Sequence, residues 1–367
     1  MSHRAVATID RRALAHNLEI ARQYAPLSKV LAVIKADAYG HGLLACAEAL
    51  RAADVLGVTD VEEAERLRRH GIHQDILVMQ GILDKSDVRR IAELGLQVVI
   101  HRTEDLALLE AELGRVRLPH RLTFWLKLDT GMGRLGIQPA EVERVHLALR
   151  RQKWTEEVIL MTHLANAGTP ESALNSKQVL NFARSCQALA DFTPQTSIAA
   201  SAALLALDVH GDYIRPGLML YGSSPFAWQD AERRRDLFGL HNVMTLQARL
   251  ISIHQHQSGD NIGYNSQFIC PQPMCVGIVS IGYADGYPGH TPNGCPVLVG
   301  DQRTHTVGRV SMDMLAIDLT NCDEAKVGDW VTLWGERLPI DEIAAHTGVI
   351  SYQLSSGLSQ RVPRIYR

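Results

Sequence analysis

Five polar side chains in this sequence stand where an apolar, strand-like run ends. Lys35 follows KVLAVI, Lys127 lies at the end of LTFWLKL, and His163 ends VILMTH. Ser201 ends TSIAAS, and Arg215 lies in DYIRPG. A lysine beside a buried strand is unusual, because partial desolvation lowers the lysine pKa. The neutral amine that results can attack a carbonyl carbon, so Lys35 is a candidate nucleophile.

These side chains can act together only if the strand ends that carry them meet at one rim. Up to about residue 221, short apolar runs alternate with amphipathic segments of helical spacing. Such alternation is typical of parallel strands joined by right-handed crossovers. We therefore expect an α/β fold, a (β/α)8 TIM barrel over about residues 10 to 235, with the polar residues at the C-terminal strand ends. A doubly wound parallel sheet is the alternative.

The apolar runs outnumber the strands of such a barrel by one. We expect the first run, AVATI at residues 5–9, to join another sheet, so that KVLAVIK begins the barrel and DYIRPG ends it. Residues 242–335 alternate polar and apolar side chains with period two, which is typical of antiparallel strands. In the C-terminal part of the chain, only IDEIAAHTG at residues 340–348 looks helical. We predict a barrel domain at 1–237 and a mostly-β C-terminal domain at 238–367.

The last two barrel loops carry the features of a phosphate site. Barrels often hold a phosphate after strands seven and eight. Ser201 supplies a hydroxyl at the start of the helix-like AALLAL, and Gly217 lets backbone amides approach closely. A phosphorylated aldehyde fits this arrangement, because a lysine amine lies on one side of the barrel mouth and a phosphate-binding site on the other. Pyridoxal 5'-phosphate has both groups, so we expect it as the cofactor.

Other interpretations of these residues are available. Gly131, Gly133 and Gly136 formally match the dinucleotide motif G-x-G-x-x-G. Asp129-Thr130 separates them from the strand and Gln138-Pro139 delays the helix, so we do not expect a nicotinamide site. Taken alone, Lys35 is more typical of a lysine whose methylene chain packs over the end of a strand while its amine stays in water. The joint pattern at one rim is what favours an active site.

Composition bounds the class of protein. The chain has 367 residues, which favours two domains. A net charge of −3 argues against nucleic acid or an anionic membrane as partner, and no apolar run is long enough to span a bilayer. Six scattered cysteines without zinc spacing and an N-terminus without an apolar signal predict a cytoplasmic protein with reduced thiols and no metal.

At VIKADAYGHG, residues 33–42, the sequence resembles the alanine racemases, barrel enzymes that depend on pyridoxal phosphate. The resemblance continues in LKLDTGMGRLG, THLANA, IAASAALL and IRPGLMLYG, and then in IGYNSQF, SIGYADGYP and VGRVSMDM. It spans essentially the whole chain in collinear order. The family fold implies a barrel followed by a β domain, with the first strand in the β domain.

The resemblance implies two catalytic residues. Lys35 matches the lysine that forms the Schiff base with the cofactor and serves as one base. Tyr264 matches the second base, which reaches the opposite face from a partner subunit; racemisation needs one group to remove the α-proton and another to return one. His163 and Arg215 match the residues that support this tyrosine. Arg215 also matches the residue that faces the pyridine nitrogen of the cofactor. Because an arginine does not readily give that nitrogen a proton, the cofactor ring withdraws electrons from the substrate less strongly.

The remaining site residues also follow from the resemblance. Arg134 matches the arginine that contacts the substrate carboxylate, and Lys127 matches a lysine that many relatives carry as a carbamate. The phosphate-binding positions are Tyr39, Ser201, Gly217 and Leu218. Tyr283, Met312 and Asp313 match the partner-subunit side of the substrate entrance, so a homodimer is implied. Gln360 stands where some relatives have a tyrosine that contributes to the phosphate site.

The leading functional hypothesis is interconversion of L- and D-alanine, which supplies D-alanine for peptidoglycan. One alternative is a racemase of broader amino-acid specificity. A second is a decarboxylase of the same architecture, against which Arg215 speaks because loss of carbon dioxide benefits from a protonated pyridine. A third is a non-catalytic pyridoxal phosphate carrier, which would need neither Tyr264 nor the β domain. The sequence leaves a biosynthetic or a catabolic role open.

Overall fold

The computed structural model describes residues 3–114, 118, 120–189, 191–230 and 235–367. The chain divides into two compact units. The barrel unit comprises Ala15–Ala38 and Leu43–Leu220; the β unit comprises Met1–Leu14, Tyr39–Gly42 and Tyr221–Arg367. The domain boundary expected from the sequence, between residues 237 and 238, stays a prediction.

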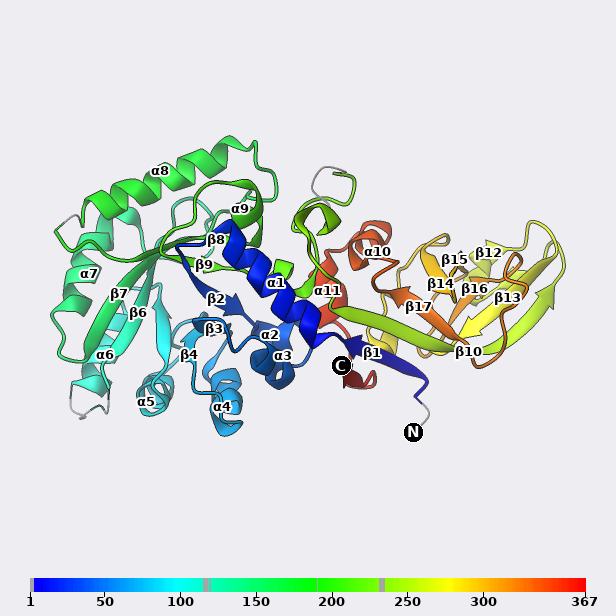
Figure 1. Cartoon of the computed structure of the whole chain (residues 1–367), viewed down its shortest axis with the longest axis horizontal. Helices are drawn as coiled ribbons and strands as arrows, with labels where there is room; N and C mark the ends of the chain where they lie inside the picture. The colour runs from blue at the N-terminus through cyan, green and yellow to red at the C-terminus, as the bar shows by residue number, and fades with distance from the viewer. Residues whose placement is uncertain (1–2, 115–117, 119, 190, 231–234) are drawn as a thin grey trace. The chain divides into compact units, whose positions relative to one another are not determined.

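Eight described strands of the barrel unit close into a parallel barrel in chain order (Figure 1). The strands are β2 (Lys29–Val33), β3 (Val55–Val58), β4 (Asp75–Val78), β5 (Gln97–Ile100), β6 (Leu122–Lys127), β7 (Thr155–Met161), β8 (Thr196–Ala200) and β9 (Tyr213–Arg215). Closure is made by β2 and β9, where Lys29 pairs with Tyr213 and Val30 with Ile214. The predicted TIM barrel, with KVLAVIK as its first strand, is confirmed.

Helices connect and surround the barrel strands, and Figure 1 shows α4 to α8 on the outside. The right-handed α-helices that begin within residues 11–206 are α1 (Arg11–Tyr24), α3 (Leu43–Ala49), α4 (Val61–Arg69), α5 (Lys85–Leu94), α6 (Asp105–Leu113), α7 (Val142–Arg150), α8 (Ala173–Gln187) and α9 (Ser201–Ala206). Local capping fixes several of their ends. The Asp60 carboxylate accepts a hydrogen bond from the N–H of Glu63 before α4, and α5 ends at Gly95 with a left-handed φ of 59°.

The β unit is built on an eight-stranded sheet in the order β13-β16-β15-β14-β17-β10-β1-β18. The bounds are β1 (Ala5–Ile9), β10 (Met244–His256), β13 (Met274–Val279), β14 (Pro296–Val299), β15 (Gln302–Val307), β16 (Leu315–Asp318), β17 (Trp330–Trp334) and β18 (Arg364–Tyr366). A two-stranded ribbon, β11 (Asn261–Ile262) with β12 (Phe268–Ile269), is separate. The run AVATI, as β1, pairs with β10 and β18.

The long strand β10 closes part of this sheet into a ring. It pairs with β17 through Leu246–Arg249 and with β13 through Leu250–His256. A register irregularity between Leu250 and Ser252 lies where the partner changes, and such a bulge bends a strand. Met244, Leu246, Ala248 and Leu250 are buried on one side, which is the period-two pattern seen in the sequence.

Two short helices follow the sheet strands. The predicted helix IDEIAAHTG is observed as α10 (Ile340–Thr347). The structure adds α11 (Ser351–Ser356), which the sequence did not predict. Its sequence, SYQLSS, lacks an apolar helical period, and Ser351 and Leu354 are buried on its inner side. Ser351 Oγ lies 2.8 Å from Ser223 Oγ, so a tertiary contact rather than local propensity accounts for this helix.

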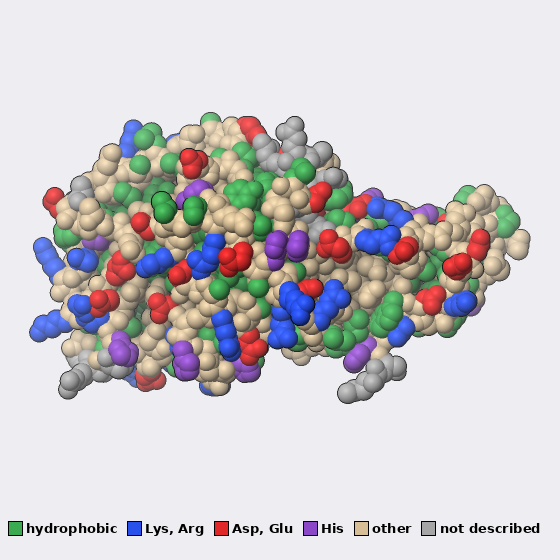
Figure 2. All heavy atoms as spheres, in the orientation of Figure 1, with side chains coloured by type: hydrophobic (Ala, Val, Ile, Leu, Met, Phe, Trp, Pro, Cys, Tyr) green, Lys and Arg blue, Asp and Glu red, His purple; other side chains and the backbone are tan. Residues whose placement is uncertain are grey.

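On the face shown in Figure 2, positive and negative side chains are interspersed. Among the described residues, no helix combines the length and the apolar character needed to cross a bilayer.

Candidate active site

Lys35 follows β2 and opens a left-handed turn, the segment α2 (Lys35–Tyr39). The φ angles of Ala36, Asp37, Ala38 and Tyr39 lie between 53° and 56°. This conformation costs roughly 1–2 kcal/mol for each L-residue, so its surroundings must hold it. The Asp37 N–H donates to a Glu63 carboxylate oxygen at 3.0 Å, and the Ala38 N–H donates to the Ile34 carbonyl at 2.9 Å.

The Lys35 amine is tuned toward its neutral form. The side chain is solvent-accessible, yet the protein atoms around it reduce its hydration and lower its pKa. The nearby Arg134 cation lowers the Lys35 pKa further, and only the Glu63 carboxylate opposes these effects. A lysine in this environment is a better nucleophile and base than a free one.

Arg215 ends β9 and is buried, with 2% of its surface exposed. Its guanidinium donates to Ser197 Oγ at 2.5 Å, to the Thr162 carbonyl at 2.6 Å and to the Ile198 carbonyl at 3.1 Å. Burial lowers the pKa of Arg215 to about 10. At neutral pH it remains a cation, which these acceptors fix in one orientation.

His163 follows β7 and faces this arginine, with Nδ1 3.5 Å from an Arg215 guanidinium nitrogen. Desolvation, and then the Arg215 cation, lower the pKa of His163 to about 3. Lys127, Arg134 and Lys35 contribute to this lowering with smaller effects. The imidazole is therefore neutral at physiological pH and can accept a hydrogen bond.

Lys127 ends β6 and is buried. Desolvation, and then the Arg215, Arg134 and Lys35 cations, lower the pKa of Lys127 to about 7. Five basic groups, Lys35, Lys127, Arg134, His163 and Arg215, thus act on one another at one rim of the barrel unit. Such a cluster favours an anionic occupant.

The glycine-rich loop after β6 carries Arg134 and is closed on itself. The Asp129 carboxylate accepts hydrogen bonds from the N–H groups of Gly131, Met132 and Gly133 at 2.9–3.0 Å. A Cβ at Gly136 would lie 2.4 Å from the Asp129 nitrogen, so the turn requires glycine there. These N–H groups are engaged by Asp129, which argues against a pyrophosphate on this G-x-G-x-x-G sequence.

The loops after β8 and β9 meet at the Ser201 hydroxyl. Ser201 Oγ accepts hydrogen bonds from the N–H of Gly217 at 3.0 Å and of Met219 at 3.3 Å. Leu218 lies between these two and begins the 3-10 turn η2 (Leu218–Tyr221). Three of the residues predicted to hold a phosphate, Ser201, Gly217 and Leu218, are therefore brought together in the barrel unit.

The fourth, Tyr39, belongs with the β unit. Its ring stacks on Tyr221 at a centroid distance of 4.7 Å and meets Tyr352 edge-on at 6.2 Å. Desolvation, and then Tyr352, raise the pKa of Tyr39 to about 12, so the phenol keeps its proton. The chain thus passes from the barrel unit to the β unit within the left-handed turn, between Ala38 and Tyr39.

The other predicted residues lie on loops of the β unit. Tyr264, 67% exposed, begins the turn η4 (Tyr264–Ser266). Tyr283, 50% exposed, begins η5 (Tyr283–Asp285), and its N–H donates to the Ser311 carbonyl at 3.0 Å. Met312 and Asp313 follow Ser311, so the loop of Tyr283 and the loop of Met312 are joined by this hydrogen bond. Gln360 is exposed near the C-terminus.

Some contributing residues were not found from the sequence. Glu63 anchors the left-handed turn and acts on Lys35, and Ser197 holds Arg215. Asp285, fully buried, supports the loop that carries Tyr283. Ser197 lies within the strand-like TSIAAS but directly follows Gln195 and Thr196, so its polarity did not single it out. Glu63 sits in the charged stretch VEEAERLRR and Asp285 is the single carboxylate of GYADGYP, and neither pattern indicates which groups these side chains contact.

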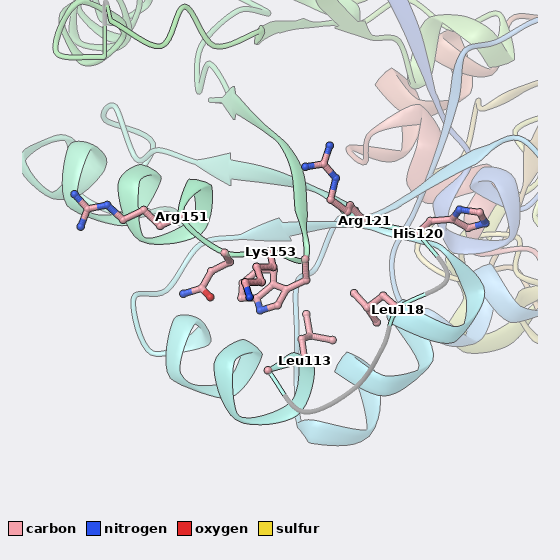
Figure 3. A pocket seen from close by; sticks show the side chains of 9 residues that line it. Leu113, Leu118, His120, Arg121, Arg151 and Lys153 are labelled. Carbon is pink, nitrogen blue, oxygen red and sulfur yellow. The ribbon is translucent and has the colours of Figure 1, made fainter.

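A separate hollow in the barrel unit lies at the N-terminal ends of β6 and β7, away from Lys35 (Figure 3). It is lined by Leu113, Gly114, Leu118, His120, Arg121, Arg151, Gln152, Lys153 and Trp154. Arg121 pairs with Glu156 at 2.6 Å, and Arg151 follows the C-terminus of α7, where cations are favoured. Arg121 is therefore already paired within the protein.

Comparison with known proteins identifies the family of the chain. The family model "Alanine racemase, N-terminal domain" matches residues 9–225, and "Alanine racemase, C-terminal domain" matches residues 243–366. The chain belongs to the alanine racemase family. An alanine racemase of Nitrosomonas eutropha is 42% identical over 367 residues, covering 98% of each chain.

Solved structures of family members have the same fold. The biosynthetic alanine racemase from Pseudomonas aeruginosa is 40% identical, is covered along 100% of both chains and superimposes with a TM-score of 0.92. The alanine racemase from Bartonella henselae with covalently bound pyridoxal phosphate is 27% identical over 100% of both chains, with a TM-score of 0.88. The chain is thus an enzyme of the racemase class, an isomerase.

Proposed function

We propose that this enzyme interconverts L-alanine and D-alanine with pyridoxal 5'-phosphate, by a two-base mechanism that uses Lys35 and Tyr264. The observation that carries the proposal is the Lys35 amine, of lowered pKa, among basic groups at the barrel rim. Family membership and the cofactor bound in the Bartonella henselae relative support it. We further propose that the product supplies D-alanine for peptidoglycan.

The residues present fit an anionic aldehyde cofactor. Lys35 would hold the aldehyde carbon through its amine, while Ser201, Gly217, Leu218 and Tyr39 would hold the phosphate. When bound, this cofactor withdraws electrons from the substrate Cα and so acidifies the α-proton. Arg215 would face the pyridine nitrogen as a cation, which limits how far electrons are withdrawn.

The two bases have distinct requirements. Lys35 can accept a proton because its pKa is lowered by desolvation and Arg134. Tyr264 must approach from the opposite face, and a phenol with an ordinary pKa of about 10 needs support to lose its proton. His163 is suited to that support because it is neutral and its Nδ1 faces the Arg215 guanidinium as acceptor. Nε2 would then carry the proton and donate a hydrogen bond to the phenol oxygen, which stabilises the phenolate.

Substrate binding is assigned to Arg134, with Lys127 behind it. Arg134 is exposed on the loop whose N–H groups donate to Asp129, and its guanidinium can bind a substrate carboxylate through two parallel hydrogen bonds. At a pKa of about 7, Lys127 is substantially neutral at physiological pH. A neutral amine can combine with carbon dioxide to form a carbamate and release a proton. Such a carbamate would place an anion beside the Arg134 and Arg215 cations, where the unmodified lysine offers none, so we propose that Lys127 is carbamylated.

We also propose a homodimer in which each site is completed by the second chain. The support is that Tyr264, Tyr283 and Met312 are large side chains at least half exposed on loops of the β unit. A second copy of this chain would cover them and bring Tyr264 to its site. We place the enzyme in the cytoplasm, in keeping with six cysteines that are all free thiols.

The test is chiral analysis of L-alanine incubated with the purified protein and pyridoxal phosphate, with L-serine and L-lysine in parallel. The proposal predicts conversion of alanine to a nearly equal mixture of enantiomers and little conversion of the others, with Lys35→Ala inactive. Comparable conversion of all three would favour the broad-specificity racemase. No inversion of any substrate would contradict the proposal.

A further inference from the structure

The loop that carries Tyr283 is anchored by a fully buried carboxylate. Asp285 has 0% of its surface exposed. It accepts hydrogen bonds from the Gly282 N–H at 3.0 Å and from the guanidinium of Arg4, with one pair of atoms 3.1 Å apart. Arg361 Nε lies 3.4 Å from the same carboxylate. A buried carboxylate is tolerated only when it is paired in this way, so these arginines are needed where they are.

Arg361 also pairs with a second carboxylate. Its Nη2 donates to Asp313, which is about half exposed. One guanidinium therefore joins the buried Asp285 to the exposed Asp313. The planar fork of five N–H donors suits such a bridge, whereas a lysine ammonium would favour one carboxylate at a time.

The two loops that these carboxylates occupy are also in direct backbone contact. The N–H groups of Tyr283 and Ala284 donate to the carbonyls of Ser311 and Met312, each at 3.0 Å. A Cβ at Gly282 would lie 2.2 Å from the Ser311 oxygen, so the loops are as close as their backbones allow. Displacement of Asp313 would therefore be transmitted to Met312 and Tyr283.

The other arginine of the R-V-P-R stretch holds a different segment. Arg364 Nε donates to the Gly40 carbonyl at 3.0 Å, next to Tyr39. Its remaining nitrogens donate to the carbonyls of Leu358 and Ser359 at 2.8 and 2.7 Å. Arg361 thus faces the entrance loops and Arg364 the Tyr39 segment, which gives a matched pair of positions within one motif.

We propose that Arg361 is a positioning residue that acts through Asp313 to hold the entrance loops, including Met312 and Tyr283, in the arrangement that admits substrate. This inference rests on the proposed function, since it takes the substrate to be alanine and the loops to form its entrance. Arg361 itself touches neither substrate nor cofactor.

The test compares holoenzymes with Arg361→Ala, Arg361→Lys, Asp313→Asn and the double change Arg361→Ala with Asp313→Asn. Losing one charge-assisted bridge should raise KM for L-alanine by about tenfold in Arg361→Ala while kcat changes by less than about twofold. Arg361→Lys should recover part of the loss. Because both residues act through one contact, the double variant should be no worse than the worse single variant.

Three controls separate positioning from general damage. Arg337→Ala removes an exposed ion pair with Asp301 and should leave KM unchanged. Arg364→Ala should weaken binding of pyridoxal phosphate, measured by fluorescence titration, whereas Arg361→Ala should not. If Arg361→Ala does not fold, the same comparison of two single variants with their double variant can be made with Arg361→Lys and Asp313→Asn.

The outcomes are distinguishable. Two results would overturn this inference while leaving the proposed function intact, provided that the wild-type enzyme is active on alanine. One is an unchanged KM in the Arg361 variants. The other is a KM increase in the double variant equal to the product of the increases in the two single variants. Parallel losses of melting temperature, cofactor affinity and kcat would also overturn it, because they indicate a purely structural role. A wild-type protein inactive on all amino acids would overturn the proposed function and this inference together.

Discussion

At the scale of single residues, the chemistry depends on charge states that the neighbours impose. His163 stays neutral because desolvation and the Arg215 cation lower its pKa to about 3. Lys127 is brought to about 7 by the same two causes. Neither value follows from residue type, since the sequence alone could place these groups on one rim but could not say which cations face which.

The His163 pKa predicts an acid-dependent loss of stability. Between pH 6.5 and about 3, the unfolded chain binds a proton at this histidine and the folded chain does not, so folding stability falls as pH falls through this window. At pH 5 the loss relative to high pH should be on the order of 2 kcal/mol. His163→Gln removes this titration, so its stability should fall less between pH 7 and pH 5.

Urea unfolding of the cofactor-free proteins at pH 7 and pH 5 checks this expectation. His73, which is exposed, provides the matched control, and His73→Gln should keep the wild-type pH dependence. Identical pH dependence in wild type and His163→Gln would show that the histidine is not held neutral.

At the scale of elements, the left-handed turn Ala36–Tyr39 is the least ordinary feature. Ala36 is exposed and has a φ of 56°. Replacing it by glycine removes the steric cost, so Ala36→Gly should raise the free energy of unfolding by about 1 kcal/mol. Ala36→Val, with a branched side chain in the same conformation, should lower it by at least about 1 kcal/mol.

Urea unfolding measures both effects, and the right-handed helix α8 supplies a control of opposite sign. Ala183 is exposed there, and Ala183→Gly should destabilise the protein by about 1 kcal/mol. A destabilising Ala36→Gly would mean that the turn is not left-handed in solution.

Much of the element layout was predictable from the sequence. The alternation of apolar runs and amphipathic segments gave the barrel, its first and last strands and the rim that carries Lys35, Lys127 and Arg215. The left-handed turn was not predicted, although A-D-A-Y-G holds small residues and an aspartate, which tolerate that conformation. The helix α11 was missed because a tertiary contact through Ser351 outweighs its weak local signal.

The Arg4–Asp285 pair could not have been predicted either. These residues are 281 positions apart, and no local pattern links them. Long-range ion pairs of this kind depend on the final packing of loops, so the sequence offered only two charged residues in unremarkable places. The same holds for the bridge between Arg361 and Asp313.

At the scale of the whole molecule, the assigned site residues fall into two sets. Lys35, Lys127, Arg134, His163 and Arg215 belong to the barrel unit, with Ser201, Gly217 and Leu218. Tyr264, Tyr283, Met312 and Asp313 belong to the β unit, where the first three are at least half exposed. The account requires that a complete site combines the first set from one chain with the second set from its partner.

Mixing of two inactive variants tests this requirement most directly. Lys35→Ala and Tyr264→Phe are purified separately, unfolded and refolded together with pyridoxal phosphate, and assayed for racemisation of L-alanine. In a two-fold dimer with random pairing, one site in each mixed dimer regains both bases, so about a quarter of wild-type activity should return. Each variant refolded alone should stay inactive. Activity that stays at the level of the separate variants, in mixtures shown to contain the mixed dimer, would contradict the shared two-base site.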